Sequence, residues 1–401
     1  MPDTSARADE TQPYRGLRVL DLGQGIASPY CGLLLALYGA DVVKVEPPEG
    51  DWARQIGTTH GGHSALSAVY NRGKRALCVD LKEADGRQIV RELALRADIL
   101  IEGFRPGVAA RLGLGYDNLQ TANPGLIYVS ISGFGQSGPY TDRPATDSLA
   151  QAFAGLVAVN RGPDGTPHRV GVTVADISTG LYAFQAVATS LYARCATGKG
   201  RWLDISLTQS TAALLGYKLA EHVLEGGRPR PLNVPGGIYQ TQDDFIMIAL
   251  ATEDQYQRLC KIIGHPGLAH DPRFTDFTRR ADNTSQLMPL IGDSLRQETT
   301  AVWLERFIAG DIIATRVLDP REWMRDPHVI ATHGVVSVET PDIGKVYVPC
   351  TPGVAPGDDS NLPPAPLIGQ HSREVLREAG VGDAEIARLV ATSVVRLAGE
   401  T

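Results

Sequence analysis

The sequence predicts an α/β protein in which a doubly wound parallel sheet forms a large domain and a smaller α+β domain accompanies it. Short apolar runs alternate with helical segments as far as about residue 206 of 401, which is typical of parallel strands covered by helices on both faces. A Gly-, Pro- and Arg-rich stretch at residues 225–231 then marks a boundary. Eight regular strand–helix units are not visible, so the pattern favours an open sheet over a barrel.

The elements of this sheet can be read in order from the hydrophobic pattern. The predicted strands are residues 17–22, 41–45, 76–81, 98–102, 126–132 and 202–206. The predicted helices are residues 29–38, 84–97, 174–196 and 207–224. Pro29 is compatible with the first turn of its helix, and Gly39 suits the cap at the other end.

Beyond the boundary the pattern indicates a smaller α+β unit. Two strands are predicted within residues 238–251, around a turn at 242–244. Helices are predicted at 253–263 and 301–307. From residue 313 onward the chain is Pro-rich and is predicted to be irregular until a helix at 372–379.

Composition and charge exclude several classes of protein. Hydrophobic residues make up 43% of the chain and charged residues 21%, which excludes a disordered, collagen-like or coiled-coil protein. The net charge of −7 is poorly suited to coating nucleic acid or an anionic membrane. The five cysteines are scattered without a CxxC pair, which favours reduced thiols over zinc ligands. No signal peptide or membrane span is visible, so we expect a cytoplasmic protein without a metal.

Two glycine-rich turns follow predicted strands. Gly23-Gln-Gly25-Ile-Ala-Ser28 is similar to a dinucleotide fingerprint with Ser at the third Gly position, and Glu46 lies near the place of a ribose-binding acid. An anion-binding turn at a helix start, or a tight turn alone, explains the same residues. The second turn, residues 133–138, is not a nucleophile elbow because Pro139 stands where that motif needs Gly, which disfavours a serine hydrolase.

Charged side chains at predicted strand and helix ends are the remaining candidates. Asp176 stands at the start of the helix predicted at 174–196, where it serves either as a helix N-cap or as an ionised nucleophile. Basic residues at the edges of the early strands indicate either a phosphate-bearing ligand or solvated surface charge. These basic residues are Lys74, Arg75, Arg105 and Arg111.

Six motifs in fixed order resemble one family over residues 15–380. They lie at residues 17–22, 37–48, 71–75, 102–107, 131–139 and 174–180, the last reading Val174-Ala-Asp-Ile-Ser-Thr-Gly180. The chain resembles the class III CoA-transferases, the superfamily of formyl-CoA transferase and carnitine CoA-transferase. The resemblance implies an acyl-CoA substrate, a carboxylic acid acceptor and no permanently bound cofactor.

The resemblance also implies roles for individual residues. Asp176 matches the nucleophile, which forms a mixed anhydride and then an aspartyl-CoA thioester. Asp147 matches a residue near the reacting end of CoA. The other matching positions along CoA are Ile26, Ala27, Asn71, Arg72, Gly73, Lys74, Gly103, Phe104, Arg105 and Arg111.

The family fold implies a Rossmann-like large domain in two sequence pieces and an interlocked homodimer. We expect a flexible arm at 1–14, the first part of the large domain at 15–224, a small domain with its linker at 225–325, and a return to the large domain at 326–401.

Some positions depart from the formyl-CoA transferase pattern. Ile26 replaces a Gln, Asp147 replaces a Glu, and only Gly236 and Gly237 stand where that enzyme has four glycines. We therefore expect an acid other than formate or oxalate, with a dicarboxylate preferred. Two alternatives are a 2-methylacyl-CoA racemase, whose proton-transferring His is replaced here by Thr146, and a Rossmann-type nucleotide-binding protein.

Overall fold

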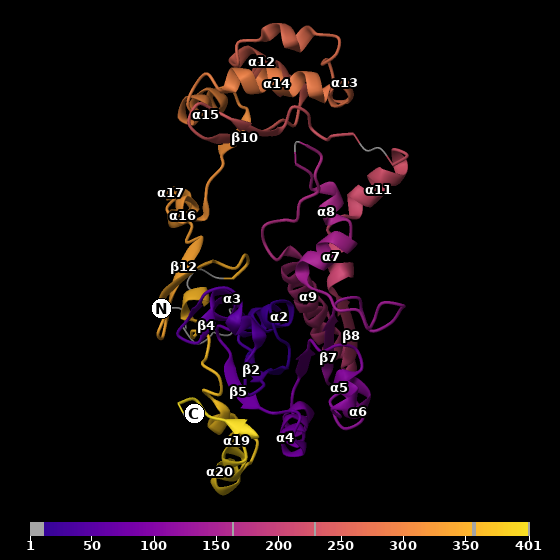
Figure 1. Cartoon of the computed structure of the whole chain (residues 1–401), viewed down its shortest axis with the longest axis vertical. Helices are drawn as coiled ribbons and strands as arrows, with labels where there is room; N and C mark the ends of the chain where they lie inside the picture. Colours follow the sequence, from indigo (N-terminus) through magenta and orange to yellow (C-terminus); the bar gives the residue numbers. More distant parts are fainter. Residues whose placement is uncertain (1–11, 163, 228–229, 355–357, 400–401) are drawn as a thin grey trace. The chain divides into compact units, whose positions relative to one another are not determined.

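The computed structural model describes residues 12–162, 164–227, 230–354 and 358–399. The chain forms two compact units (Figure 1). The first contains Met1–Leu215 and His333–Thr401, and the second contains Gly216–Thr332. The boundaries expected from the sequence lay between residues 224 and 225 and between residues 325 and 326. Helix α11 (Gly216–Leu224) was therefore expected in the large domain, but its contacts place it in the second unit.

The first unit is built on a seven-stranded sheet. The strands are β1 (Arg18–Asp21), β2 (Asp41–Glu46), β5 (Arg75–Val79), β6 (Ile99–Glu102), β7 (Ile127–Ser132), β8 (Arg201–Ser206) and β14 (Val395–Arg396). Their order is β14-β5-β2-β1-β6-β7-β8, and only β14 pairs antiparallel. The six parallel strands, counted along the chain, therefore follow the order 3-2-1-4-5-6 of Rossmann folds. The predicted α/β fold with a mostly parallel sheet is confirmed.

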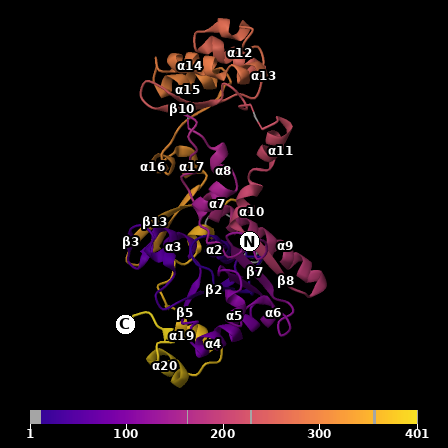
Figure 2. The same cartoon turned by 45° about the vertical axis from the view of Figure 1, so that its right-hand side comes forward.

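Helices cover both faces of this sheet (Figures 1 and 2). On one face, α2 (Ala27–Leu37) and α9 (Val174–Thr197) share a core with Val19, Val42 and Ile99. The opposite face packs against α4 (Ala84–Leu95), α19 (Ser372–Glu378) and α20 (Asp383–Ala391). Every residue of β6 and β7 is buried, which explains why these strands are nearly continuous apolar runs.

Short elements complete the first unit. They are η1 (Trp52–Gln55), β3 (Thr59–His60), β4 (His63–Ser64), α3 (Ala65–Tyr70), α5 (Val108–Arg111), α6 (Tyr116–Leu119), α7 (Asp147–Phe153), α8 (Leu156–Val159), α10 (Leu207–Ala213), β12 (Val335–Thr340), β13 (Gly344–Pro349) and α18 (Asp358–Asn361). The single helix predicted at 207–224 is two helices, α10 and α11. The prediction of an irregular chain after residue 313 is wrong, because β12 and β13 form a hairpin and α20 and β14 follow.

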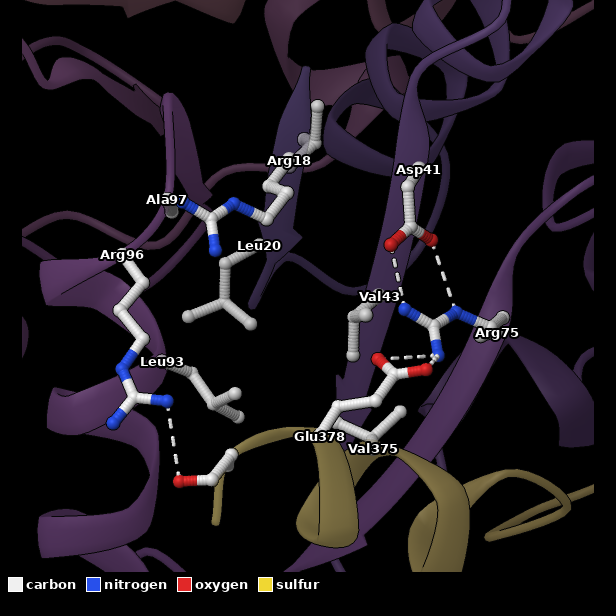
Figure 3. A pocket seen from close by; sticks show the side chains of 12 residues that line it. Arg18, Leu20, Asp41, Val43, Arg75, Leu93, Arg96, Ala97, Val375 and Glu378 are labelled. Carbon is white, nitrogen blue, oxygen red and sulfur yellow. Dashed lines mark hydrogen bonds and ion pairs between the residues drawn. The ribbon is translucent and has the colours of Figure 1, made fainter. Parts of the chain in front are cut away.

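Arg75 at the start of β5 connects helix α19 to the start of β2 (Figure 3). Its guanidinium donates to Asp41 at 2.5 Å and to Glu378 at 2.9 Å, as Figure 3 shows. It also donates to Glu374 at 2.8 Å. Arg75, Asp41 and Glu378 border a cavity of about 90 Å³, and Leu20 also forms part of its wall. Arg75 begins β5 and therefore lies at the amino-terminal edge of the sheet, so its interpretation as a phosphate ligand at strand carboxyl ends is wrong.

The second unit has a three-stranded antiparallel sheet in the order β11-β10-β9. Its strands are β9 (Gly237–Gln240), β10 (Phe245–Ala249) and β11 (Ile313–Arg316), and its helices are α11, α12 (Glu253–Ile262), η2 (Pro266–His270), α13 (Phe277–Asp282), α14 (Thr284–Leu295), α15 (Thr300–Ala309), α16 (Pro320–Trp323) and α17 (Pro327–Ala331). Arg280 is fully buried in its core, where it donates to Glu253 at 2.7 Å and stacks on Tyr256.

In the part of the chain that the structure describes, no helix is long and apolar enough to cross a membrane.

Candidate active site

The strand order of the first unit reverses between β1 and β6, and such reversals open a crevice at the carboxyl ends of the strands. The turn at residues 23–28 follows β1, and the turn beginning at Gly103 follows β6. A Cβ on Gly103 would lie 2.9 Å from Ser28 Oγ and 3.5 Å from Gly23 Cα. The two turns therefore touch, and glycine at position 103 permits this close approach.

A cavity of about 240 Å³ opens beside these turns. Five of the residues expected from the sequence line it, namely Ile26, Ala27, Gly103, Asp147 and Asp176. The other lining residues are Gln24, Ser28, Trp52, Ile131, Ser132, Gly133, Ala145, Thr146 and Leu207. The cavity thus joins the ends of β1, β6 and β7 to the start of α9.

Asp176 lies in the first turn of α9, whose N-cap is Thr173. The interpretation of Asp176 as the N-cap residue is therefore wrong. Its carboxylate accepts no hydrogen bond from the residues that the structure describes. Burial, and secondarily the negative charge of Asp147, raise the pKa of Asp176 from 3.8 to about 7. The carboxyl consequently keeps its proton to a much higher pH than an exposed Asp does.

Asp147 caps the helix that carries Asp176. One carboxylate oxygen accepts from the backbone N–H of Ala175 at 2.7 Å and of Asp176 at 3.4 Å. The other accepts from the Gln151 amide at 2.7 Å, and Gln151 itself is fully buried. An anionic group at a helix N-terminus is favourable, so Asp147 stabilises the start of α9. The charge of Asp147 also disfavours the ionised form of Asp176.

The predicted CoA contacts at residues 71–74 do not line this cavity. Lys74 is buried, and its ammonium donates to Asp21 at 2.9 Å, to Pro29 O at 2.8 Å and to Asn71 Oδ1 at 3.1 Å. These three bonds use all three ammonium protons. Arg72 is likewise buried and pairs with Asp359 at 3.4 Å, while the Gly73 N–H donates to Pro363 O. Contact of residues 71–74 with CoA stays a prediction.

The other expected residues line neighbouring hollows or the surface. Phe104 lines a hollow of about 180 Å³ at the ends of β1, β2 and β5, and Gln24 lines both this hollow and the Asp176 cavity. Arg105 lines a third hollow, of about 200 Å³, together with Glu102. Arg111 is exposed on α5, and within the described ranges neither its guanidinium nor that of Arg105 has a hydrogen-bond partner.

Several residues of this region were not anticipated from the sequence. Gln24 lies in the glycine-rich turn at residues 23–28, but nothing else in the sequence indicated that it lines a cavity. Trp52 reaches the Asp176 cavity from η1, and Lys82 reaches the neighbouring hollow from the end of β5. Nothing in the sequence around Trp52 indicated this placement, and the residue is 52% exposed in the structure.

The model of CoA-transferase family III matches residues 14–372. The chain belongs to this family. It is 32% identical to succinyl-CoA–D-citramalate CoA-transferase of Chloroflexus aurantiacus, over 96% of this chain and 98% of that protein. It is 31% identical to human succinyl-CoA:glutarate CoA-transferase, over 96% of this chain and 90% of that protein. The chain is therefore an enzyme of the CoA-transferase class.

Solved structures agree with this assignment. A CaiB/BaiF family protein from Brucella suis superimposes with a TM-score of 0.80 at 30% sequence identity, over 92% of this chain and all of that one. The family III architecture therefore extends over both units of the chain.

Proposed function

We propose that the chain transfers coenzyme A from an acyl-CoA to a small carboxylic acid with Asp176 as the covalent carrier. The observation that carries the proposal is the Asp176 carboxylate, which lines a cavity at the reversal of strand order and lacks a hydrogen-bond partner among the described residues. A carboxylate held this way is poorly stabilised by its surroundings and is therefore reactive toward an acyl carbon.

The proposed chemistry proceeds in balanced steps. An Asp176 oxygen attacks the thioester carbonyl carbon, the C–S bond breaks, and a mixed anhydride and CoA thiolate result. The thiolate attacks the Asp176 carbonyl carbon and releases the donor acid, leaving an aspartyl-CoA thioester. The acceptor carboxylate attacks this thioester to give a second mixed anhydride and free thiolate. The thiolate then attacks the acceptor carbonyl, which forms the product acyl-CoA and restores Asp176.

Backbone donors support the attack step. The N–H groups of Ile26 and Ala27 have no hydrogen-bond partner in the described ranges, and both residues line the cavity with Asp176. Preorganised N–H groups of this kind stabilise the oxyanion of a tetrahedral intermediate by a few kcal/mol, roughly 10²–10³ in rate. Ala27 also begins α2, whose helix dipole favours negative charge at that end.

The hollows suggest a course for CoA. We propose that the nucleotide occupies the hollow lined by Phe104, with Lys82 available to its phosphates. The pantetheine arm then passes Gln24, which borders both hollows, and brings the thioester to Asp176. The exposed guanidinium groups of Arg105 and Arg111 are further candidates for phosphate contact.

Trapping the intermediate tests the proposal. The enzyme is incubated with an acyl-CoA donor, treated with hydroxylamine or borohydride, and digested for mass spectrometry. Modification of the peptide that contains Asp176 is expected, and it is expected to disappear in Asp176→Asn. Transfer activity that survives in Asp176→Ala would overturn the covalent mechanism.

The acceptor is proposed to be a small dicarboxylate. The support comes from the relatives, whose names include the dicarboxylates citramalate and glutarate. Short mono- and dicarboxylates, supplied with acetyl-CoA or succinyl-CoA and followed by mass spectrometry of the CoA esters, distinguish the acids. A clear preference for monocarboxylates would contradict this part of the proposal.

A homodimer is proposed on the strength of uncovered apolar side chains. Tyr192 on α9 is 83% exposed, and Phe153 on α7 is 55% exposed. Such exposure of large apolar groups is typical of a surface that another chain covers. Light scattering after size exclusion is expected to give twice the mass of 42.9 kDa.

A further inference from the structure

A group of charged side chains is buried directly beneath the turn at residues 23–28. Each member is at most 3% exposed, and acids and bases are equal in number. The acids are Asp21, Glu46 and Asp51, and the bases are Lys44, Arg54 and Lys74. Burial of charge is costly, and a buried ion pair is often no more stable than an apolar replacement. The contacts of this group with the turn therefore suggest a role beyond stability.

Lys44 and Asp51 bind the backbone of the turn. The Lys44 ammonium donates to Gly23 O and, at 2.9 Å, to an Asp51 carboxylate oxygen. The Asp51 carboxylate accepts from Gly25 N–H at 3.0 Å and from Ala53 N–H at 2.9 Å. The pair thereby joins two segments, the turn after β1 and the short helix η1.

Both joined segments are walls of the Asp176 cavity. Gly25 has a φ of +83°, and a Cβ at this residue would lie 2.4 Å from Trp52 Cζ2, so the indole ring rests on the turn. Trp52 and Ile26 line the cavity. The N–H groups of Gly23 and Gly25 donate to Asp21 and Asp51. Those of Ile26 and Ala27 have no partner among the described residues and are therefore available to a substrate.

We propose that Lys44 and Asp51 are positioning residues for the transfer reaction. The pair fixes the positions of the unpaired N–H groups of the turn and of the Trp52 side chain relative to the Asp176 carboxylate. This inference rests on the proposed function, because it assigns the turn a part in stabilising the transition state. A displacement of these N–H groups by about 1 Å lowers the rate on the order of 10²-fold. Because the groups act on the transition state, we expect the loss in kcat.

The test separates positioning from stability with a neutral double variant. Lys44→Met with Asp51→Leu removes both charges and both hydrogen-bonding groups, so that Gly23 O, Gly25 N–H and Ala53 N–H lose their partners. We expect this enzyme to fold with a lowered Tm and to lose on the order of 10² in kcat, while KM for acyl-CoA changes less than about threefold. A double variant that folds and keeps the wild-type kcat would overturn the inference.

Two further variants keep the test informative if Lys44→Met with Asp51→Leu does not fold. Lys44→Gln with Asp51→Asn keeps a donor and an acceptor without charge, and kcat within about tenfold of wild type is expected because the turn remains bonded. Asp51→Glu keeps the charge but lengthens the side chain by one methylene, and a loss of kcat beyond tenfold is expected. If Asp51→Glu folds and turns over normally, or if Lys44→Gln with Asp51→Asn is as slow as the apolar pair, positioning through these hydrogen bonds is refuted.

Two measurements keep the failure of this inference distinct from failure of the proposed function. Asp41→Asn removes an ion pair at the opposite edge of the same sheet, and it is expected to lower Tm while leaving kcat unchanged. The trapping of wild-type Asp176 is scored independently of these variants. If wild type forms the adduct but the Lys44 and Asp51 variants turn over normally, only the positioning role is lost.

Discussion

Replacing Asp176 by Asn is expected to stabilise the first unit above neutral pH while abolishing transfer. The folded-state pKa of about 7 lies about three units above the ordinary 3.8, which corresponds to about 4 kcal/mol at 1.36 kcal/mol per unit. Because the cavity is open to solvent on one side, we expect screening to reduce this to about 2 kcal/mol. The folded state binds the proton more tightly than the unfolded state, so this cost is absent below pH 3.8, grows as pH rises, and is complete above 7.

Urea unfolding followed by circular dichroism at two pH values measures this effect. Asp176→Asn is expected to exceed wild type by about 2 kcal/mol at pH 8 and by less than about 1 kcal/mol at pH 4.5. Asp142→Asn, at an exposed residue, serves as the matched control and is expected to show no such pH dependence. A variant no more stable than wild type at pH 8, or an equal difference at both pH values, would refute the reasoning from burial.

Three further predictions concern rate and stability. The transfer rate should rise with pH through about 7 as Asp176 ionises, and Asp147→Asn should lower that midpoint because it removes a like charge, as measured in a pH–rate profile. Gly25→Ala should reduce kcat/KM at least about tenfold in steady-state assays, because its φ is +83° and a Cβ would strike the Trp52 ring. Arg280→Met should destabilise the second unit by about 3 kcal/mol in hydrogen-exchange measurements, since it leaves Val234 O and Phe274 O without their donor.

Much of the large unit could be predicted from the sequence because its strands are buried on both faces and therefore form continuous apolar runs. The edge strand β14 could not, because a strand of two residues carries no periodicity. The β12–β13 hairpin was missed because nearby prolines suggested irregular chain. Its alternation in Val335–Thr340 was the available signal.

The candidate site was predictable where topology alone brings residues together. The turn after β1, Gly103 and Asp176 meet because parallel strands end at one edge of the sheet. Lys44 was not recognised because a lysine within a strand is ordinarily a solvent-facing residue. Its burial depends on Asp51 and on the carbonyl of Gly23, and those partners become adjacent only in the folded chain.

The pairing of β14 with β5 has a consequence for synthesis on the ribosome. The second unit, Gly216–Thr332, emerges before α19, α20 and β14, which complete one face and one edge of the first unit. Until those elements emerge, β5 presents an open edge and the apolar face around Leu77 lacks part of its cover. Once residues up to about 340 have left the exit tunnel, the nascent chain should therefore contain a folded second unit and a protease-sensitive first unit. This vulnerability ends only when residue 396 has also emerged.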